Sequence, residues 1–199
     1  RIHKQDIINN HNISDGDVIV GLSSSGKTTY ESEYNSGIGS NGLTSARHDI
    51  FHHNLAVEFP ESFDPMMDSA LVYSGTKSLF DNLKSTTLAK LVLSPTRTYA
   101  PVIKKIMQYY RNEISGMIHC TGGGQTKVLH FIENLHICKN SMFDIPPIFR
   151  LIKEESNASW QEMYKVFNMG HRMEIYAKKE VSNKIIDIAS SFDLDAKII

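Results

Sequence analysis

The chain has few cysteines and almost no net charge, and both scarcities limit what it can be. Its 199 residues contain only Cys120 and Cys138, too few for the disulfide framework of a small secreted protein. We therefore expect a cytoplasmic protein. The 21 basic residues are balanced by 22 acidic ones, so the composition gives no indication of a nucleic-acid or membrane partner.

Long apolar runs are also missing. No run approaches the roughly 18 residues of a membrane-spanning helix, and no signal peptide opens the chain. The length suits one large domain or two small ones. The chain begins at Arg1 in a segment with apolar residues and ends in the apolar residues 196–199, so we expect it to be part of a longer polypeptide.

The apolar pattern predicts one compact α/β domain over residues 1–199. Short β-branched runs predict strands at 17–22, 116–120, 173–177 and 196–199. Helical spacing predicts helices over 43–55, 99–113, 128–135, 147–155, 159–167 and 181–192. Ser159 and Glu162 form a capping box, and Pro147 suits a first helical turn. The glycine-containing stretch 28–42 and residues 56–86 are expected to be irregular.

Residues 21–28 match the phosphate-binding pattern G-x-x-x-x-G-K-[ST] at every fixed position. A strand precedes the match, as the mechanism requires. The required helix does not follow, because residues 28–42 carry three glycines and no apolar residues at helical spacing. No later apolar strand ends in an acid that could hold Mg²⁺. A nucleotide hydrolase is thus a rival interpretation, and Lys27 is better read as a coincidence.

Other residues could bind an anion. Three consecutive glycines, Gly122, Gly123 and Gly124, follow a strand and could bring backbone N–H groups close to a phosphate, or simply form a tight turn. His119 beside them could donate to a phosphate, act as acid or base, or be a core histidine. Arg97 could meet an anion or an interior carboxylate, and Asn168 could offer a ligand amide or hold a turn.

No catalytic residue stands out. His48 and His52 have i, i+4 spacing on a predicted helix, but the acidic or third ligand of a zinc site is missing. We expect a solvated helix face there and no metal site. There is also no Ser/His/Asp order, no context for a cysteine nucleophile and no paired acids.

Six strings occur in order along the chain. This series resembles the C-terminal half of the aminoimidazole ribonucleotide synthetases, the phosphoribosylformylglycinamidine cyclo-ligase family, over nearly the whole sequence. Six ordered strings are far more specific than the single match at 21–28. The strings are Asp15-Gly16-Asp17-Val18-Ile19-Val20-Gly21-Leu22-Ser23-Ser24-Ser25-Gly26, Ser40-Asn41-Gly42, Ser94-Pro95-Thr96-Arg97-Thr98-Tyr99, His119-Cys120-Thr121-Gly122-Gly123-Gly124, Ile145-Pro146-Pro147-Ile148-Phe149 and Phe167-Asn168-Met169-Gly170.

The resemblance implies an α/β (α+β) fold, a layered mixed sheet with flanking helices and a partial likeness to the ferredoxin-like arrangement. It also implies a reaction of purine biosynthesis. ATP phosphorylates the amide oxygen of formylglycinamidine ribonucleotide, a neighbouring nitrogen attacks, and phosphate leaves. Positioning and Mg²⁺ supply most of the catalysis in such phosphoryl transfer. The family's ATP-binding and metal-binding half, which also forms the homodimer core, lies outside this sequence, so we expect the piece to be inactive alone.

Two departures limit the resemblance. Residues 27–39 separate Gly26 from Ser40, and Gly39 stands where the family has histidine. His171 and Arg172 follow Gly170, where the family has a small apolar residue and glycine. A non-catalytic paralogue of the fold therefore stays open as an alternative. The resemblance implies contacts with the nucleotide substrate at Ser24, Gly26, Ser40, Asn41, Gly42, Arg97, His119, Thr121, Gly122, Gly123, Gly124 and Asn168.

Overall fold

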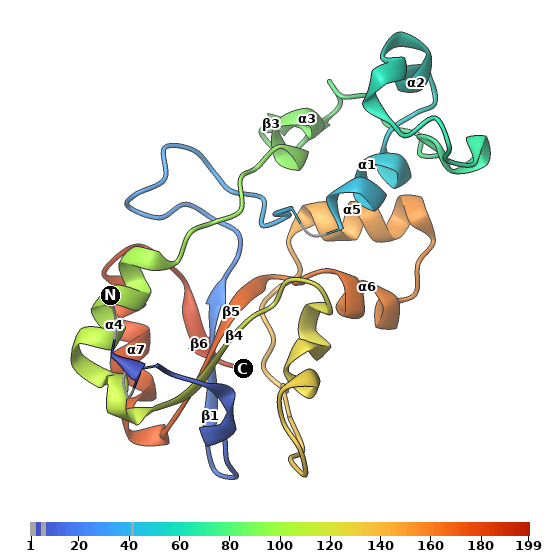
Figure 1. The fold of residues 1–199 in the computed structure, drawn as a ribbon. Helices are drawn as coiled ribbons and strands as arrows, with labels where there is room; N and C mark the ends of the chain where they lie inside the picture. The colour runs from blue at the N-terminus through green and yellow to red at the C-terminus, as the bar shows by residue number, and fades with distance from the viewer. Residues whose placement is uncertain (1–2, 5–6, 41) are drawn as a thin grey trace.

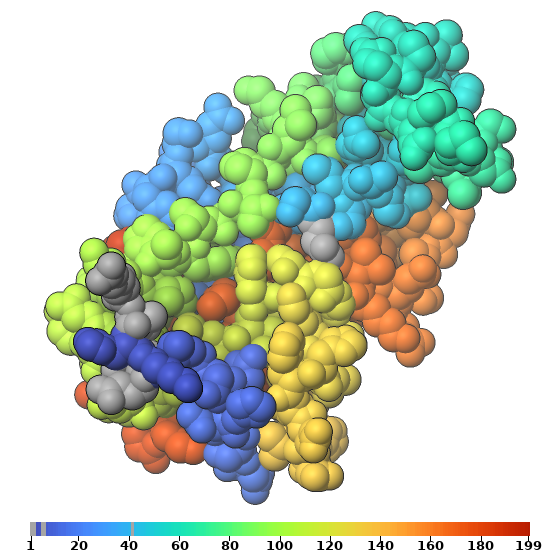
Figure 2. All heavy atoms as spheres, viewed as in Figure 1, coloured from blue at the N-terminus to red at the C-terminus, as the bar shows by residue number. Residues whose placement is uncertain are grey.

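A computed structural model describes residues 3–4, 7–40 and 42–199 (Figure 1). A four-stranded sheet with two helices forms one part of the molecule, and a group of short helices forms the other. Figure 2 shows residues of the segment 54–80 at the far end from the sheet. Asn41, one of the predicted substrate contacts, lies outside the described residues.

The sheet has the strand order β4-β5-β1-β6, and each neighbouring pair is antiparallel. Along the central strands β1 and β5, buried and exposed side chains do not alternate. Almost every side chain is buried, because both faces of the sheet are covered. Val20 on one strand lies opposite Ile175 on the next, and both are fully buried. The strands are β1 (Val18–Ser23), β4 (Ile114–His119), β5 (His171–Ala177) and β6 (Ala196–Ile198).

Two helices cover one face of this sheet: α4 (Ala100–Tyr110) and α7 (Lys179–Ser190) lie side by side in Figure 1. Val102, Ile106 and Ile185 point inward at helical spacing and pack on the strand residues. The chain order β1-α4-β4-β5-α7-β6 is that of a ferredoxin-like unit. The predicted likeness to that arrangement is therefore confirmed by the topology.

The opposite face of the sheet is covered by a 3₁₀ helix, η6 (Gly124–His130), and the extended residues after it. Val128 and Phe143 pack there against Ile118 and Tyr176. The helix predicted over 128–135 is wrong: the helical turn begins earlier, at the glycines, and ends at His130. Three successive positive φ angles at the glycines set its direction, which apolar spacing did not reveal.

The second part has its own core. Ile50, Phe149 and Ile152 are fully buried there with Phe167. The helix predicted over 43–55 breaks at Phe51, whose backbone is extended, so two helices replace one. The elements are α1 (Leu43–Ile50), α2 (Asn54–Glu58), η3 (Pro60–Ser62), η4 (Ser69–Leu71), β2 (Asn82–Leu83), β3 (Thr86–Thr87), α3 (Leu88–Val92), α5 (Pro147–Ser156) and α6 (Trp160–Val166), while η2 (Asn10–Asn12) and η5 (Arg111–Glu113) belong to the sheet part.

Most of the predicted elements are present, and the α/β class is confirmed. Pro147 occupies the first turn of α5, and the Ser159 hydroxyl accepts from the Glu162 N–H at 3.2 Å, as the capping box predicts. The four-stranded sheet is antiparallel rather than mixed. Among the described residues, no helix has both the length and the apolar character needed to cross a membrane.

Candidate functional site

Ser24 and Asn168 join the end of β1 to the turn before β5. The Ser24 hydroxyl donates to Asn168 Oδ1 at 2.6 Å, and the Gly170 N–H donates to the same oxygen at 3.2 Å. Asn168 Nδ2 donates to the Gly37 carbonyl at 2.7 Å. Both side chains are buried and use their hydrogen-bonding capacity on the protein itself. Their ordering of three loops is clear, whereas a direct ligand contact stays a prediction.

Arg97 meets an interior carboxylate, one of the two partners that its sequence position allowed. Its Nε and Nη2 bind the two oxygens of Glu31 at 2.9 and 2.7 Å, a bidentate pair. Its remaining donors reach the carbonyls of Ser23, Ser25 and Gly26 at 2.9–3.1 Å. Burial opposes ionisation of Glu31, but the Arg97 bonds outweigh it and lower the pKa of the carboxyl. Arg97 therefore fixes the loop after β1.

The residues after Gly26 do not form a phosphate-binding loop. No helix occurs among the described residues between Lys27 and Leu43, and Lys27 is exposed. Thr28 uses its hydroxyl and its N–H on Glu31, at 3.1 and 2.9 Å. Gly26 and Asn35 exchange backbone hydrogen bonds of 3.0 and 2.8 Å, which closes residues 27–34 into a loop. The hydroxyl and the helix that would bind Mg²⁺ and phosphate are thus unavailable in this geometry.

His119 lies at the end of β4, exposed, with the glycine turn directly after it. Although the residue is exposed, partial burial of its ring lowers the pKa of His119, and the positive charges of Arg172 and Lys127 lower it further. Lys127 Nζ donates to the Thr121 carbonyl and reaches the Thr121 hydroxyl at 3.4 Å. The electrostatic environment of His119 is therefore cationic, which favours an anion.

The three glycines have different surroundings. All have positive φ, at 56°, 100° and 49°. Gly124 is buried, and a Cβ there would lie 2.5 Å from the Tyr164 carbonyl oxygen, so this glycine is needed for packing against α6. Gly122 and Gly123 are not enclosed in this way, and their N–H groups have no acceptor among the described residues. They are the part of the turn that can face a ligand.

Arg172 is buried next to the loop before α1. Only 2% of it is exposed, and its Nη2 donates to the Gly37 carbonyl at 2.7 Å. Its Nη1 has no hydrogen-bond partner, and no carboxylate among the described residues pairs with it. A Cβ on Gly39 would lie 2.1 Å from Nη2, so the two departures from the family pattern are in contact. The guanidinium occupies the space of a side chain at position 39.

Glu174 is the centre of a buried polar network on the other face of β5. Lys139 Nζ lies 2.5 Å from its Oε1, His171 Nε2 lies 3.0 Å from the same oxygen, and the Tyr176 hydroxyl donates to Oε2 at 2.7 Å. Burial opposes its ionisation, but the bond from His171 and the charge of Lys139 outweigh it and hold the pKa at about 2. Burial lowers the pKa of His171 in turn.

Cys120 joins this network, and its ligand atom lies within 4.8 Å of those of His171 and Glu174. Thiol, imidazole and carboxylate groups can bind a transition metal. Here the Lys139 ammonium already neutralises Glu174 and also contacts the carbonyl and side-chain oxygens of Gln125. The cluster is therefore a neutralised ion-pair network, in which burial raises the pKa of the Cys120 thiol.

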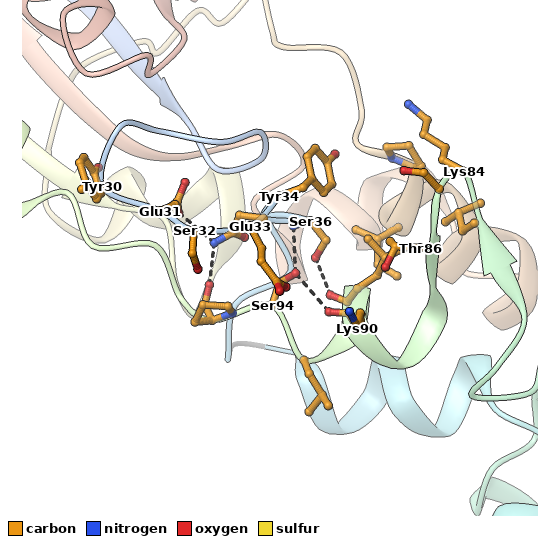
Figure 3. Close-up of a pocket in the computed structure, with 18 residues that line it drawn as sticks. Tyr30, Glu31, Ser32, Glu33, Tyr34, Ser36, Lys84, Thr86, Lys90 and Ser94 are labelled. Atoms are coloured by element: carbon orange, nitrogen blue, oxygen red, sulfur yellow. Dashed lines mark hydrogen bonds between the residues drawn. The ribbon is translucent and has the colours of Figure 1, made fainter.

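A separate pocket of about 780 Å³ opens between residues 30–36 and the α3 region (Figure 3). Tyr34, Lys84 and Ser94 are among its lining residues, and none of the predicted substrate contacts is. Its floor is tied together by the Ser36 hydroxyl, which donates to the Leu91 carbonyl at 2.6 Å. The pocket lies behind the Arg97–Glu31 pair, since Glu31 also lines it.

The histidines of α1 are not all solvated, so that prediction is wrong for one of them. His48 is buried, stacks on Tyr73 and accepts from the Tyr73 N–H through Nδ1 at 3.1 Å. His52 is exposed, as expected. The helix breaks at Phe51, before His52, so their i, i+4 spacing on one helix is lost.

The structure divides the predicted contacts into two groups. Ser24, Arg97, Asn168 and Gly124 are buried supports. The carbonyl of half-buried Gly26 accepts from Arg97, and Gly42 precedes α1 against the Phe167 ring. Ser40, His119, Thr121, Gly122 and Gly123 have access to solvent and lie at the ends of two segments that meet Arg172. Sequence reasoning missed Arg172, Glu31, Lys139 and Glu174 as members of these networks. Only the departure from the family pattern at 171–172 gave a signal.

Fold and motif residues together define a domain of the aminoimidazole ribonucleotide synthetase class. Residues 14–199 match the family described as "AIR synthase related protein, C-terminal domain", and the chain belongs to this family.

The relatives carry a more particular name. The chain is 33% identical to a protein of Methanococcus vannielii over the whole of this chain and 47% of the relative. It is 29% identical to one of Methanocaldococcus jannaschii (100% of the chain, 48% of the relative) and 26% identical to one of Alkaliphilus metalliredigens (100% and 49%). All three are named phosphoribosylformylglycinamidine cyclo-ligase. The chain spans about half the length of these relatives.

Proposed function

We propose that residues 1–199 are the single C-terminal domain of an ATP-dependent cyclo-ligase. The reaction closes formylglycinamidine ribonucleotide to aminoimidazole ribonucleotide, through an iminophosphate, in de novo purine biosynthesis. The observation that carries the proposal is the match of the whole chain to relatives named for this cyclo-ligase. The contribution of this domain is to bind and orient the nucleotide substrate.

The site geometry supports a substrate-positioning role. His119, Thr121 and the N–H groups of Gly122 and Gly123 offer donors at one sheet end, and no described acid enters the environment of His119. A phosphorylated substrate fits such donors. Ser24, Arg97 and Asn168 hold the surrounding loops, and fixed positioning lowers the barrier of phosphoryl transfer.

Mg²⁺ does not fit this site. It prefers carboxylate oxygens, but Glu31 is held by Arg97 and Glu174 by Lys139. ATP with its metal therefore belongs to the half of the relatives that this chain does not match. Because the ATP-binding half is missing, we propose that the 199-residue chain alone does not turn over. From the resemblance to the family we also propose that the active protein is a cytoplasmic homodimer.

A chimaera tests the proposal. The matched half of the M. vannielii relative is replaced by this chain, and aminoimidazole ribonucleotide and ADP are measured with substrate, ATP and Mg²⁺. We expect ring closure by the chimaera and none by the 199-residue chain. A folded chimaera that binds ATP but closes no ring would favour the non-catalytic paralogue. Substrate-dependent ADP release by the chain alone would contradict the division of roles between the halves.

A further inference from the structure

Arg172 is a buried cation for which the described residues supply no counter-ion. Buried charges are normally paired, because taking an ion out of water is costly. Arg97, also buried, follows this rule through its bidentate bond to Glu31. Among the described residues, Arg172 donates to the Gly37 carbonyl, and its Nη1 has no hydrogen-bond partner. The missing partner is therefore an anion that the described residues do not supply.

The surroundings of Arg172 offer further donors. The Cys120 N–H, directly after exposed His119, donates to the Arg172 carbonyl, and Lys127 Nζ donates to the Thr121 carbonyl, so three basic residues lie on adjoining segments. The N–H groups of Gly122 and Gly123 also have no acceptor within the described part of the chain. Such a combination of a guanidinium, an imidazole and free backbone N–H groups suits the three terminal oxygens of a phosphate monoester.

Gly39 lies directly against the guanidinium. A Cβ at this position would lie 2.4 Å from Arg172 Cζ, so only a residue without a side chain allows this close approach. The Gly39 N–H itself has no acceptor among the described residues. Gly39 is buried and Ser40 next to it is exposed, so the segment that contacts Arg172 reaches the surface within one residue.

We propose that Arg172 is a phosphate-binding residue that, with His119 and the N–H groups of Gly122 and Gly123, binds the phosphate monoester of the ligand beside Gly39. In the proposed cyclo-ligase this group is the 5′-phosphate of the ribonucleotide, and this part of the inference rests on the proposed function. Binding of a phosphate monoester as such does not depend on it.

The test uses the 199-residue chain and follows the His119 imidazole signals by NMR during titration with ribose 5-phosphate, with ribose and inorganic phosphate as comparison probes. We expect saturable shifts with both phosphates and none with ribose. Arg172→Met should weaken phosphate binding at least 10-fold. Arg172→Lys keeps the positive charge but loses the bidentate hydrogen bonding of the guanidinium, so it should bind phosphate with intermediate affinity. Lys153→Met, on the distant helix α5, is the control and should bind as the parent does.

A second variant covers the case in which Arg172→Met does not fold. Gly39→Ala keeps the charge but places a methyl group on the guanidinium, so it should also weaken binding. The inference would be overturned if the His119 signals did not shift with either phosphate. It would also be overturned if the parent, Arg172→Lys and Gly39→Ala bound phosphate with equal affinity. An inactive chimaera with intact ribose 5-phosphate binding would count against the proposed function alone. An active chimaera whose KM is unchanged by Arg172→Met would count against the inference alone.

Discussion

Ser24 Oγ donates a 2.6 Å hydrogen bond to Asn168 Oδ1 across 144 residues of sequence. The bond is buried and joins two of the six strings that define the family resemblance. Because Asn168 also binds Gly37 and Gly170, one amide fixes three loops around the candidate site.

Removal of the Asn168 amide should destabilise the protein. Asn168→Ala leaves the Ser24 hydroxyl and the Gly37 carbonyl without this partner, and we expect a loss of about 2–4 kcal/mol in the free energy of unfolding. Urea denaturation measures the loss. A double-mutant cycle with Ser24→Ala should give a coupling energy of about 0.5–3 kcal/mol. Additive effects of the two substitutions would show that the bond contributes nothing.

Arg97→Lys should not behave as a conservative substitution. Lysine cannot form the bidentate bond to Glu31 and also reach the three carbonyls, so we expect unfolding free energy to fall by about 2–4 kcal/mol. Thermal and urea denaturation measure the loss. Arg150→Lys, at an exposed position of α5, is the matched control and should change stability little. Equal stability of the two variants would contradict the conclusion that Arg97 stabilises the loop after β1.

Stability should fall on acidification because of the network at Glu174. The pKa of His171 is lowered in the folded protein, so below its unfolded value of 6.5 the unfolded chain binds more protons. The pKa of Glu174 is also lowered, from 4.5 to about 2, so stability falls further as the pH drops from 4.5 towards 2.

Urea denaturation at a series of pH values measures this dependence. Loss of the Glu174 contribution amounts to up to about 3 kcal/mol. Glu174→Gln should be less stable at pH 7, because Lys139 is left unpaired, and should show a flatter acid limb. Glu180→Gln, at an exposed position, should keep the parent's profile. A Glu174→Gln variant with the parent's pH profile would contradict the assignment.

The neighbouring glycines should tolerate alanine differently. Gly123→Ala meets only Lys127 atoms at 3.5 Å or more, whereas Gly124→Ala meets backbone oxygens at 2.5 and 2.7 Å. Both positions have positive φ, so each substitution carries about 1–2 kcal/mol of backbone strain and Gly124→Ala adds a steric clash. Melting temperatures should therefore fall more for Gly124→Ala. The reverse order would contradict the packing against α6.

Lys27→Ala should leave the protein unchanged. The lysine is exposed and the described residues 28–40 contain no helix, so we expect neither stability nor nucleotide binding to depend on its ammonium group. Equilibrium binding of ATP with Mg²⁺ to the parent and to the variant measures this. A loss of ATP binding in Lys27→Ala would restore the nucleotide-hydrolase interpretation.

Local patterns were sufficient to predict the elements with strong signals. The β-branched run of β1, the apolar stripe of α4 and the capping box of α6 each depend on residues close in sequence, and each is present. The prediction for η6 was wrong, because three positive φ angles decide where this helix starts and glycine permits many conformations.

The sequence alone also determined the family, because the six strings and their order can be recognised without knowing which residues contact one another. Only the tertiary structure decided what those residues do. Arg97 and Asn168 could each have met a ligand or the protein, and folding placed Glu31 and Ser24 beside them. Arg172 is the reverse case, since folding buried it with no anionic partner among the residues that the structure describes. Partners separated by more than 60 residues are chosen by packing, which no local pattern records.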